Sequence, residues 1–377
     1  MRLSLRRLNR ALLARQLLLD RAPLGVEDAV DRLVALQAQE PASPYLALWG
    51  RLDSFDPTAL DRAFAGYRVV KGTSVRMTLH AVGAADHAPF HEAMQPSLRP
   101  ARLLDRRFRV AGLSPEQADA LIPEVLEFTA EPRTNAAMEA WMDARLGVLP
   151  RPGVWWALKT YGPFIHAPTG GPWSFGPRPS YLAARDLARV GDPDLALKHL
   201  VRRYLEGFGP ATVADVAQFA QVHRPRVRKA LASIASQVVE VAGPDGQVMY
   251  DVPGGPLPAE DTPAPARLLP MWDSTLLAHA DRGRILPEPL RRHIIRRNGD
   301  TLPVLLVDGL VTGVWRAVPE GIEATALVPL SGEAWTALDA EAASLRQLLL
   351  KREPLVYSRY TRWWSTLPAA EVRILGA

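Results

Sequence analysis

Hydrophobic and polar positions recur along this chain in a helix–helix–hairpin order three times, although the three stretches share little sequence identity. The third stretch is the clearest. Apolar residues at helical spacing run from 213 to 220 behind a capping Thr212, and a second helix is expected to start at Pro225. Two strand-like runs, 238–241 and 248–252, then flank the turn Pro244-Asp245-Gly246. Helix, turn, helix and wing is the order of a winged-helix unit.

The other two stretches have the same order with less regular spacing. In the second, we expect helices at 134–142 and 154–161 on either side of segment 149–152, and a wing strand at 164–167 that turns at 169–172 and returns through Trp173. In the first, we expect helices at 8–19 and 26–37, followed by strands 69–71 and 75–82 that turn about Gly72. The pattern predicts an α+β fold of three tandem winged-helix motifs, with boundaries at 1–115, 116–190 and 191–258.

A proline-rich stretch, 252–265, leads into a C-terminal α/β region that we place at 259–377. This region contains the best hairpin signal in the chain, because runs 304–307 and 310–315 flank the dipeptide Asp308-Gly309. Such a dipeptide predicts a two-residue turn of type I′. Nearly all of the hairpin is apolar, so the pattern favours a pair of buried core strands.

Two glutamines at the end of an apolar-periodic segment are the main candidates for chemistry. Val30, Leu33, Val34 and Gln37 follow the spacing of one helical face, so Gln37 continues a stripe that points inward. Pro41 favours an end to the helix nearby, after which the amides of Gln37 and Gln39 could face one cleft and hold a water molecule. The alternative is that both amides cap the helix end and satisfy buried backbone groups.

Composition is that of an ordinary globular protein, with 48% hydrophobic and 23% charged residues. The net charge of +5 suits an anionic partner such as nucleic acid or a membrane surface. An arginine-rich proteome would also explain it, since only five of the 45 basic residues are lysine. The absence of cysteine excludes disulfides, thiolate nucleophiles, iron–sulfur clusters and the usual zinc knuckles. We expect a cytoplasmic protein, because neither a signal-peptide core nor an apolar run of membrane-spanning length is found.

Other catalytic motifs are missing from the sequence. His87 and His91 have helical spacing but no third ligand beside them, so we expect no metal site and no cofactor. There is no glycine-rich phosphate loop, no G-x-S-x-G elbow and no H-E-x-x-H pair. None of the five lysines sits in a sequence context that argues for a nucleophilic amine.

The glutamine segment also carries a family resemblance. The run Leu36-Gln37-Ala38-Gln39, followed by Pro41 and by 44–49 (PYLALW), resembles the signature of the AlkZ-like winged-helix DNA glycosylases, which unhook interstrand crosslinks. Further motifs with the family's order and approximate spacing are found at 75–80 (VRMTLH), 208–212 (FGPAT), 269–273 (LPMWD) and 307–309 (VDG). The resemblance implies that Gln37 and Gln39 are catalytic, that the motifs enclose a concave DNA-binding cleft, and that the Asp308-Gly309 hairpin reaches the minor groove.

A carboxamide has no useful proton affinity, so a glutamine pair can orient a water molecule but cannot act as a strong base. A base alkylated at N7, such as N7-alkylguanine, is cationic and leaves as a neutral molecule. These two facts and the resemblance predict a monofunctional DNA N-glycosylase for repair or for self-resistance to an alkylating agent. Its expected partner is double-stranded DNA with alkylated or crosslinked purines, bound by a monomer and without a membrane. The alternative is a non-catalytic winged-helix transcriptional regulator, and a weaker one is a protein-interaction scaffold.

The candidate DNA contacts fall in three places. On the first wing, beside the glutamines, they are Lys71, Arg76 and His80. On the second helix of the third unit, where they would form its basic face, they are Arg226, Arg228 and Lys229. At the C-terminal hairpin they are Asp308, Gly309 and Arg316. The basic face could equally be a solvated surface, and His80 a structural histidine.

Overall fold

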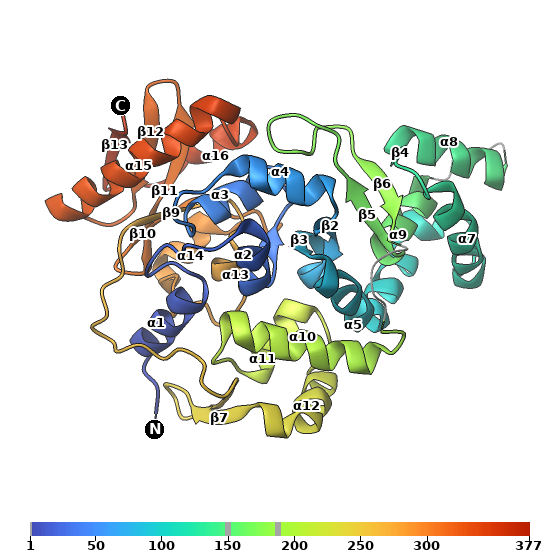
Figure 1. The fold of residues 1–377 in the computed structure, drawn as a ribbon, viewed down its shortest axis with the longest axis horizontal. Coiled ribbons are helices and arrows are strands. Elements are labelled where there is room, and N and C mark those ends of the chain that lie inside the picture. The colour runs from blue at the N-terminus through green and yellow to red at the C-terminus, as the bar shows by residue number, and fades with distance from the viewer. Residues whose placement is uncertain (1, 148–151, 185–189) are drawn as a thin grey trace.

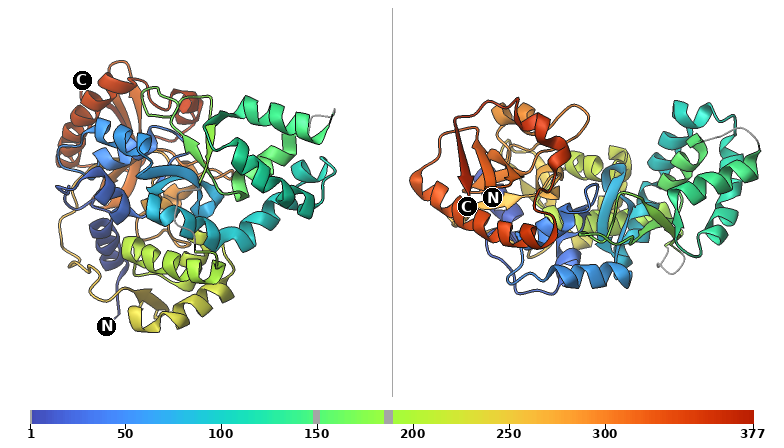
Figure 2. Two further views of the ribbon diagram at one scale, coloured as in Figure 1. Left: turned by 45° about the vertical axis from the view of Figure 1, so that its right-hand side comes forward. Right: turned by 90° about the horizontal axis from the view of Figure 1, so that it is seen from above.

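In the computed structural model, residues 2–147, 152–184 and 190–377 are described (Figure 1). Their strands form an antiparallel sheet of six strands in the order β1-β3-β2-β5-β6-β4, a second of five in the order β13-β12-β11-β10-β9, and the hairpin β7-β8. A large hydrophobic core underlies most of the chain, and a separate one fills the lobe of α5 to α9. Figure 2 shows α7 and α8 in this lobe, on the side away from the C-terminal sheet.

The N-terminal region is helical before it joins the six-stranded sheet. Its helices are α1 (Leu5–Arg15), α2 (Val26–Leu33), α3 (Ser43–Trp49) and α4 (Pro57–Ala65). The prediction that α2 continues to Gln37 is wrong. Val34 takes a φ of 71°, and β1 (Leu36–Gln37) pairs with β3 instead, with Gln37 opposite His80. Backbone pairing with a distant strand therefore overrides the helical spacing of Gln37.

The first wing consists of β2 (Val69–Ser74) and β3 (Thr78–Gly83), joined by a 3₁₀ turn at Val75–Met77. The predicted turn at Gly72 is wrong, because Gly72 lies within β2. A Cβ at Gly72 would be 2.4 Å from Nε2 of His87, so the glycine permits close packing against helix α5 (Ala84–Leu103). The actual turn contains Arg76 and Met77, each with a φ of 56°.

The second stretch contributes the other half of the same sheet. Its elements are α6 (Arg106–Arg109), α7 (Pro115–Phe128), β4 (Arg133–Thr134), α8 (Asn135–Leu146), α9 (Pro152–Tyr161), β5 (Phe164–Ala167) and β6 (Ser180–Ala183). Residues 149–151 of the predicted connecting segment 149–152 lie outside the described residues, and Pro152 begins α9. The predicted return strand through Trp173 is wrong: residues 168–179 form a loop, in which the Trp173 ring packs 5.2 Å from that of Tyr45. Because β5 pairs with β2, one sheet joins the first two predicted units.

The third stretch contains α10 (Pro193–Phe208), α11 (Val213–Ala220), α12 (Arg224–Ser233), a 3₁₀ turn (Ala235–Gln237), β7 (Val239–Ala242) and β8 (Val248–Asp251). The prediction that Thr212 caps α11 is confirmed. Its hydroxyl accepts the backbone N–H of Asp215 at 3.2 Å, and the Asp215 carboxylate accepts the N–H of Thr212 at 2.8 Å. The predicted helix, helix and hairpin thus occur in that order.

The C-terminal region surrounds the five-stranded sheet. Its strands are β9 (Arg267–Leu269), β10 (Val304–Val307), β11 (Leu310–Val318), β12 (Gly321–Ala326) and β13 (Glu371–Leu375), and its helices are α13 (Ser274–Leu277), α14 (Glu288–Ile294), α15 (Gly332–Arg352), a 3₁₀ turn (Ser358–Tyr360) and α16 (Thr361–Trp364). The turn between β10 and β11 has positive φ at Asp308 (49°) and Gly309 (77°), as type I′ requires. Across the described residues, no helix combines the length and hydrophobicity needed to cross a membrane.

Candidate active site

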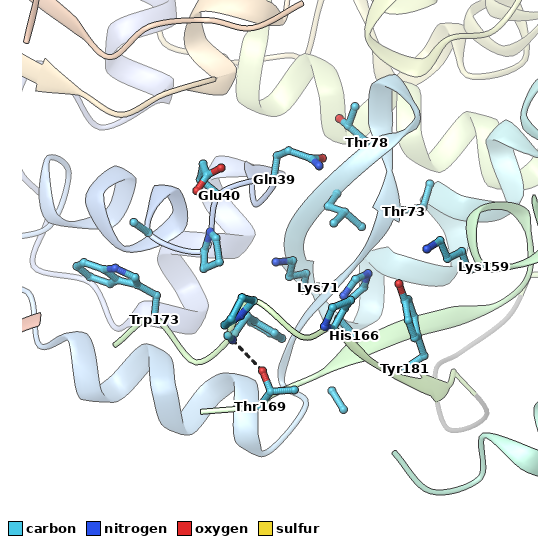
Figure 3. A pocket seen from close by; sticks show the side chains of 18 of the residues that line it. Gln39, Glu40, Lys71, Thr73, Thr78, Lys159, His166, Thr169, Trp173 and Tyr181 are labelled. Atoms are coloured by element: carbon cyan, nitrogen blue, oxygen red, sulfur yellow. Dashed lines mark hydrogen bonds between the residues drawn. The ribbon is translucent and has the colours of Figure 1, made fainter. Parts of the chain in front are cut away.

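A cavity with a volume of about 760 Å³ lies beside Gln39, and we call it the main cavity. It lies between the six-stranded sheet, helix α9, the loop 168–179 and the C-terminal segment 353–359. Gln39, Lys71, Thr78, Lys159, His166 and Tyr181 are among the residues that line it (Figure 3). These side chains come from the predicted first and second units, and no described residue of 191–258 lines the cavity.

The two glutamines have different environments. Gln39 is exposed and lines the main cavity, whereas Gln37 is only 5% exposed. The side-chain carbonyl of Gln37 accepts the backbone N–H of Gln39 at 2.7 Å, and its amide Nε2 donates to Oγ1 of Thr78 at 3.3 Å. Gln37 and Asp273 also border a small second cavity of about 10 Å³, which has room for about one water molecule. Gln37 therefore holds the segment from which Gln39 reaches the main cavity.

Strand alternation divides the first wing between two faces of the sheet. Lys71, Thr73 and Leu79 line the main cavity. His80 belongs to the opposite face of the sheet, where it is paired with Gln37 on one side and with Gly72 on the other. His80 is fully buried there, and its Nε2 lies 2.9 Å from Nη2 of Arg76. Burial and the neighbouring guanidinium lower the pKa of His80 well below its usual value, so His80 is a neutral, structural histidine.

Arg76 belongs to the same buried environment. Its guanidinium carbon lies 5.6 Å from the Phe219 ring centroid, and burial lowers its pKa to about 10. Neither Arg76 nor His80 lines the main cavity. Of the three residues predicted on the first wing, the structure brings only Lys71 to the cavity with Gln39.

The cavity contains several basic side chains whose pKa values are lowered because they are buried. Burial lowers the pKa of Lys71 to about 8, and burial followed by the charge of Lys71 lowers that of His166 to about 3. Burial also lowers the pKa of Lys159 and raises that of Tyr181 to about 12. Lys71 and His166 face each other across the β2–β5 pair. Sequence reasoning missed Lys159, His166 and Tyr181, since no local pattern marks them.

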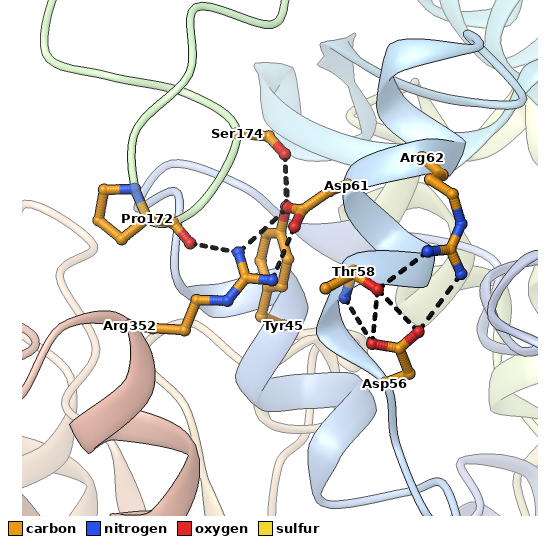
Figure 4. A network of polar contacts seen from close by, with 8 residues as sticks. All are labelled: Tyr45, Asp56, Thr58, Asp61, Arg62, Pro172, Ser174 and Arg352. Carbon is orange, nitrogen blue, oxygen red and sulfur yellow. Dashed lines mark hydrogen bonds and ion pairs between the residues drawn. The ribbon is translucent and has the colours of Figure 1, made fainter.

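One wall of the cavity is fixed by a polar network around Asp61 (Figure 4). The Asp61 carboxylate accepts hydrogen bonds from Tyr45, Ser174 and Arg352, and Arg352 also donates to the carbonyl of Pro172 at 2.7 Å. Burial by itself raises the pKa of Asp61, but these donors outweigh it and the pKa is lowered. The network ties loop 168–179 to α4 and α15, so the wall is held by groups far apart in the chain.

Sequence reasoning also missed Arg359, which lines the cavity beside Glu40, and an arginine-rich loop that lies outside the cavity. Glu40 forms an ion pair with Arg359 and accepts a hydrogen bond from Tyr360, whose ring packs against Trp272. Trp272 in turn donates to the carbonyl of Gly299, at the end of an arginine-rich loop. Arg296 and Arg297 in this loop are exposed and form no ion pair with any described residue. The repeated Arg-Arg pairs at 291–292 and 296–297 were a signal for this surface.

The other predicted DNA contacts lie away from the main cavity. On α12, Arg226 and Lys229 both form ion pairs with Asp194, whereas Arg228 is exposed and has no ion pair with a described residue. At the C-terminal hairpin, Asp308 forms ion pairs with Arg6 and Arg10.

Gly309 is buried against α1, with its carbonyl accepting from Asn9, and Arg316 forms a bidentate pair with Glu323 at 2.7 Å. The hairpin turn therefore packs against the N-terminal helix. None of these residues is brought next to Gln39.

The chain is similar to known proteins over most of its length. Residues 30–348 match the family model described as DNA glycosylase AlkZ-like. A Streptomyces sahachiroi protein, "Interstrand DNA cross-link repair glycosylase", is 25% identical over 358 residues, covering 87% of this chain and 92% of that protein. The structure of Streptomyces sahachiroi DNA glycosylase AlkZ superposes with a TM-score of 0.79 at 23% identity, covering 94% of this chain and 99% of the other. This chain therefore belongs to the AlkZ-like family of DNA glycosylases, hydrolases that act on N-glycosyl bonds.

Proposed function

We propose that this chain releases cationic N7-alkylated purines from double-stranded DNA in the main cavity, with Gln39 as the residue that orients the attacking water and Gln37 as the residue that positions Gln39. The observation that carries the proposal is the hydrogen bond between the Gln37 carbonyl and the Gln39 backbone, which holds an exposed amide at the cavity. A side-chain amide offers a carbonyl acceptor and two N–H donors, so it can hold a water without carrying charge.

The substrate supplies the rest of the driving force. Alkylation at N7 makes guanine a cation that departs as a neutral base, so the glycosidic bond breaks without a strong acid from the protein. The sugar then develops positive charge in an oxocarbenium-like transition state, which fixed carbonyl dipoles stabilise without reorganising. Gln39 and Thr78 both line the cavity, and both are hydrogen-bonded to the side chain of Gln37. Unmodified bases leave poorly and are spared.

The volume of the main cavity indicates how large a damaged base it can accept. At about 760 Å³ and lined by residues of three regions, it has room for more than one flipped base. This favours bulky adducts and interstrand crosslinks as substrates, in line with the name of the relative from Streptomyces sahachiroi. We propose that the three helix–helix–hairpin stretches act as winged-helix modules of a monomer that places duplex DNA across this site.

The exposed arginines of the loop that follows α14 are the best candidates for phosphate contacts. Arg296 and Arg297 have no carboxylate partner among the described residues, so binding a phosphate breaks no existing ion pair. Contacts of this kind fix the position of DNA and make binding dependent on salt. Arg228 on α12 is available in the same way, whereas Arg226 and Lys229 first have to release Asp194.

Release of free 7-methylguanine from a methylated duplex, in EDTA, tests the proposal. We expect the wild type to release the base and the variants Gln37→Ala and Gln39→Ala to lose this activity. Duplex affinity should stay within a few-fold of wild type. If only a crosslinked duplex is processed, the lesion range is narrower than proposed; if neither duplex is processed, the proposal is wrong and the chain acts as a DNA-binding protein.

A further inference from the structure

The main cavity contains an amine with an unusual environment. Lys71 is only 5% exposed, and its Nζ lies 4.6 Å from the ring centroid of Phe175. The Lys71 amine forms neither a hydrogen bond nor an ion pair with any other described residue. Its neighbour on the paired strand β5 is His166, which is neutral because its pKa is lowered to about 3. An ammonium that serves as a phosphate contact is typically exposed, and Lys71 is nearly enclosed.

The choice of lysine at this position is itself informative. Forty of the 45 basic residues are arginine, yet two of the five lysines, Lys71 and Lys159, line this one cavity. Arginine binds phosphate better than lysine because its planar fork donates two hydrogen bonds at once. Lysine has one property that arginine lacks: its amine can lose a proton and become a nucleophile.

The environment of Lys71 favours this deprotonated form. Burial lowers its pKa to about 8, and no carboxylate opposes the effect. At pH 7 about a tenth of the side chain is then a neutral amine, against less than about a thousandth for a solvated lysine. Desolvation in an apolar pocket is the usual way in which proteins activate a lysine for attack on a carbonyl. Lys159 differs, since its Nζ lies 3.3 Å from Oδ1 of Asn135.

The sheet places this amine close to the glutamine strand. Lys71 pairs with Ala81 of β3, and Ala81 pairs with Leu36 of β1, the residue before Gln37. Figure 3 shows Lys71 between Gln39 and His166. A sugar whose base has been released beside Gln39 therefore presents its C1′ in the cavity that contains the Lys71 amine.

We propose that Nζ of Lys71 attacks C1′ of the abasic deoxyribose that base release leaves, so that the chain has a second activity as an abasic-site lyase. This inference rests on the proposed function, because the sugar must occupy the main cavity. It goes beyond base release, in which water is the nucleophile, and it departs from the monofunctional glycosylase that the sequence predicts, because the burial of Lys71 in the cavity is not visible in the sequence.

The steps balance without an added oxidant or reductant. The ring-opened sugar is an aldehyde, and the neutral amine adds to C1′ and loses one water to form an imine. The imine makes the C2′ proton acidic; this proton passes to water, and the C3′–O bond breaks with the electron pair leaving on the 3′ phosphate. Water then hydrolyses the conjugated imine, which frees Lys71 and leaves an unsaturated aldehyde on the nicked strand.

A duplex with one preformed abasic site tests the proposal, because it requires no base release. Full-length protein is incubated with this duplex and sodium cyanoborohydride, which reduces an imine to a stable secondary amine. We expect a covalent adduct whose tryptic mapping identifies Lys71, and a nicked strand when cyanoborohydride is omitted. Lys71→Arg should lose the adduct, and the exposed Lys351→Arg should form as much adduct as the wild type.

Folding and duplex affinity are measured for Lys71→Arg and for a second variant, Lys71→Met, so that loss of structure is not mistaken for loss of the nucleophile. An adduct of equal yield in folded Lys71→Arg, or one that maps to Lys159, overturns the proposal. Absence of an adduct in the wild type, while 7-methylguanine is released, overturns the lyase and leaves base release intact. An adduct at Lys71 without base release supports the lyase and contradicts the proposed function.

Discussion

The side-chain carbonyl of Gln37 accepts the backbone N–H of Gln39 at 2.7 Å, so the first glutamine positions the second. Gln37 is buried and also contacts Thr78, whereas Gln39 is exposed at the main cavity. Two residues of the same type, two positions apart, therefore have unequal structural roles. This asymmetry distinguishes the present structure from the simple expectation of two equivalent amides in one cleft.

The first prediction follows from that asymmetry. Gln39→Ala should abolish base release with almost no change in the free energy of unfolding, because its side chain is exposed. Gln37→Ala should abolish base release and also cost about 1–3 kcal/mol, because it removes both the acceptor for the backbone N–H of Gln39 and the donor to the hydroxyl of Thr78. Urea unfolding beside the base-release assay checks both. Equal losses of stability would contradict the positioning role of Gln37.

The second prediction concerns pH. The pKa of Lys71 is about 8 in the folded protein and 10.5 for a solvated lysine, so between these values the unfolded chain binds more protons. Stability contributed at this site therefore rises as pH increases from about 8 to 10.5. Between pH 7.5 and 9.5 the wild type should gain about 2 kcal/mol relative to Lys71→Met, which has no titrating group there. Parallel pH profiles of the two proteins would contradict the lowered pKa.

The third prediction concerns the DNA-contacting surface. Arg296→Ala and Arg297→Ala should each reduce the salt dependence of duplex binding by about one phosphate contact, because both arginines are exposed and neither forms an ion pair with a described residue. The guanidinium of Arg296 also lies 4.0 Å from the ring centroid of Trp363, a contact that leaves its charge available to a phosphate. Arg226→Ala is the matched control: its guanidinium is paired with Asp194, so its removal should change the slope less. Fluorescence anisotropy over a range of salt concentrations measures all three slopes. A larger effect at Arg226 would favour the predicted basic helix over the arginine loop.

The fourth prediction tests the C-terminal hairpin. A Cβ at Gly309 would lie 2.6 Å from Oδ1 of Asn9, and the φ of 77° is one that only glycine adopts easily. Gly309→Ala should lower the free energy of unfolding by at least about 1–2 kcal/mol, because it adds backbone strain to this clash. Duplex affinity of the folded variant should be unchanged, since the turn packs on α1. A selective loss of affinity would instead indicate a direct contact with DNA.

Residue patterns that act within a few positions determined much of this fold. Thr212 with Asp215 specified the start of α11, because the side chain of each residue accepts a hydrogen bond from the backbone N–H of the other. Asp308-Gly309 specified the hairpin turn, because few other dipeptides accept two positive φ angles. The family motif that contains Gln37 and Gln39 was likewise visible in the sequence.

Only the tertiary structure decided where these elements went. Helical spacing assigned Gln37 to α2, but pairing of β1 with β3 moved it into a sheet, because backbone hydrogen bonds to a distant strand outweigh local spacing. Lys71, Lys159 and His166 have no local pattern, and they share a cavity only because β2 pairs with β5 and α9 packs beside them. Their lowered pKa values come from burial, which is a property of the folded chain. The sequence by itself determined the chemical groups, and long-range packing determined which of them meet.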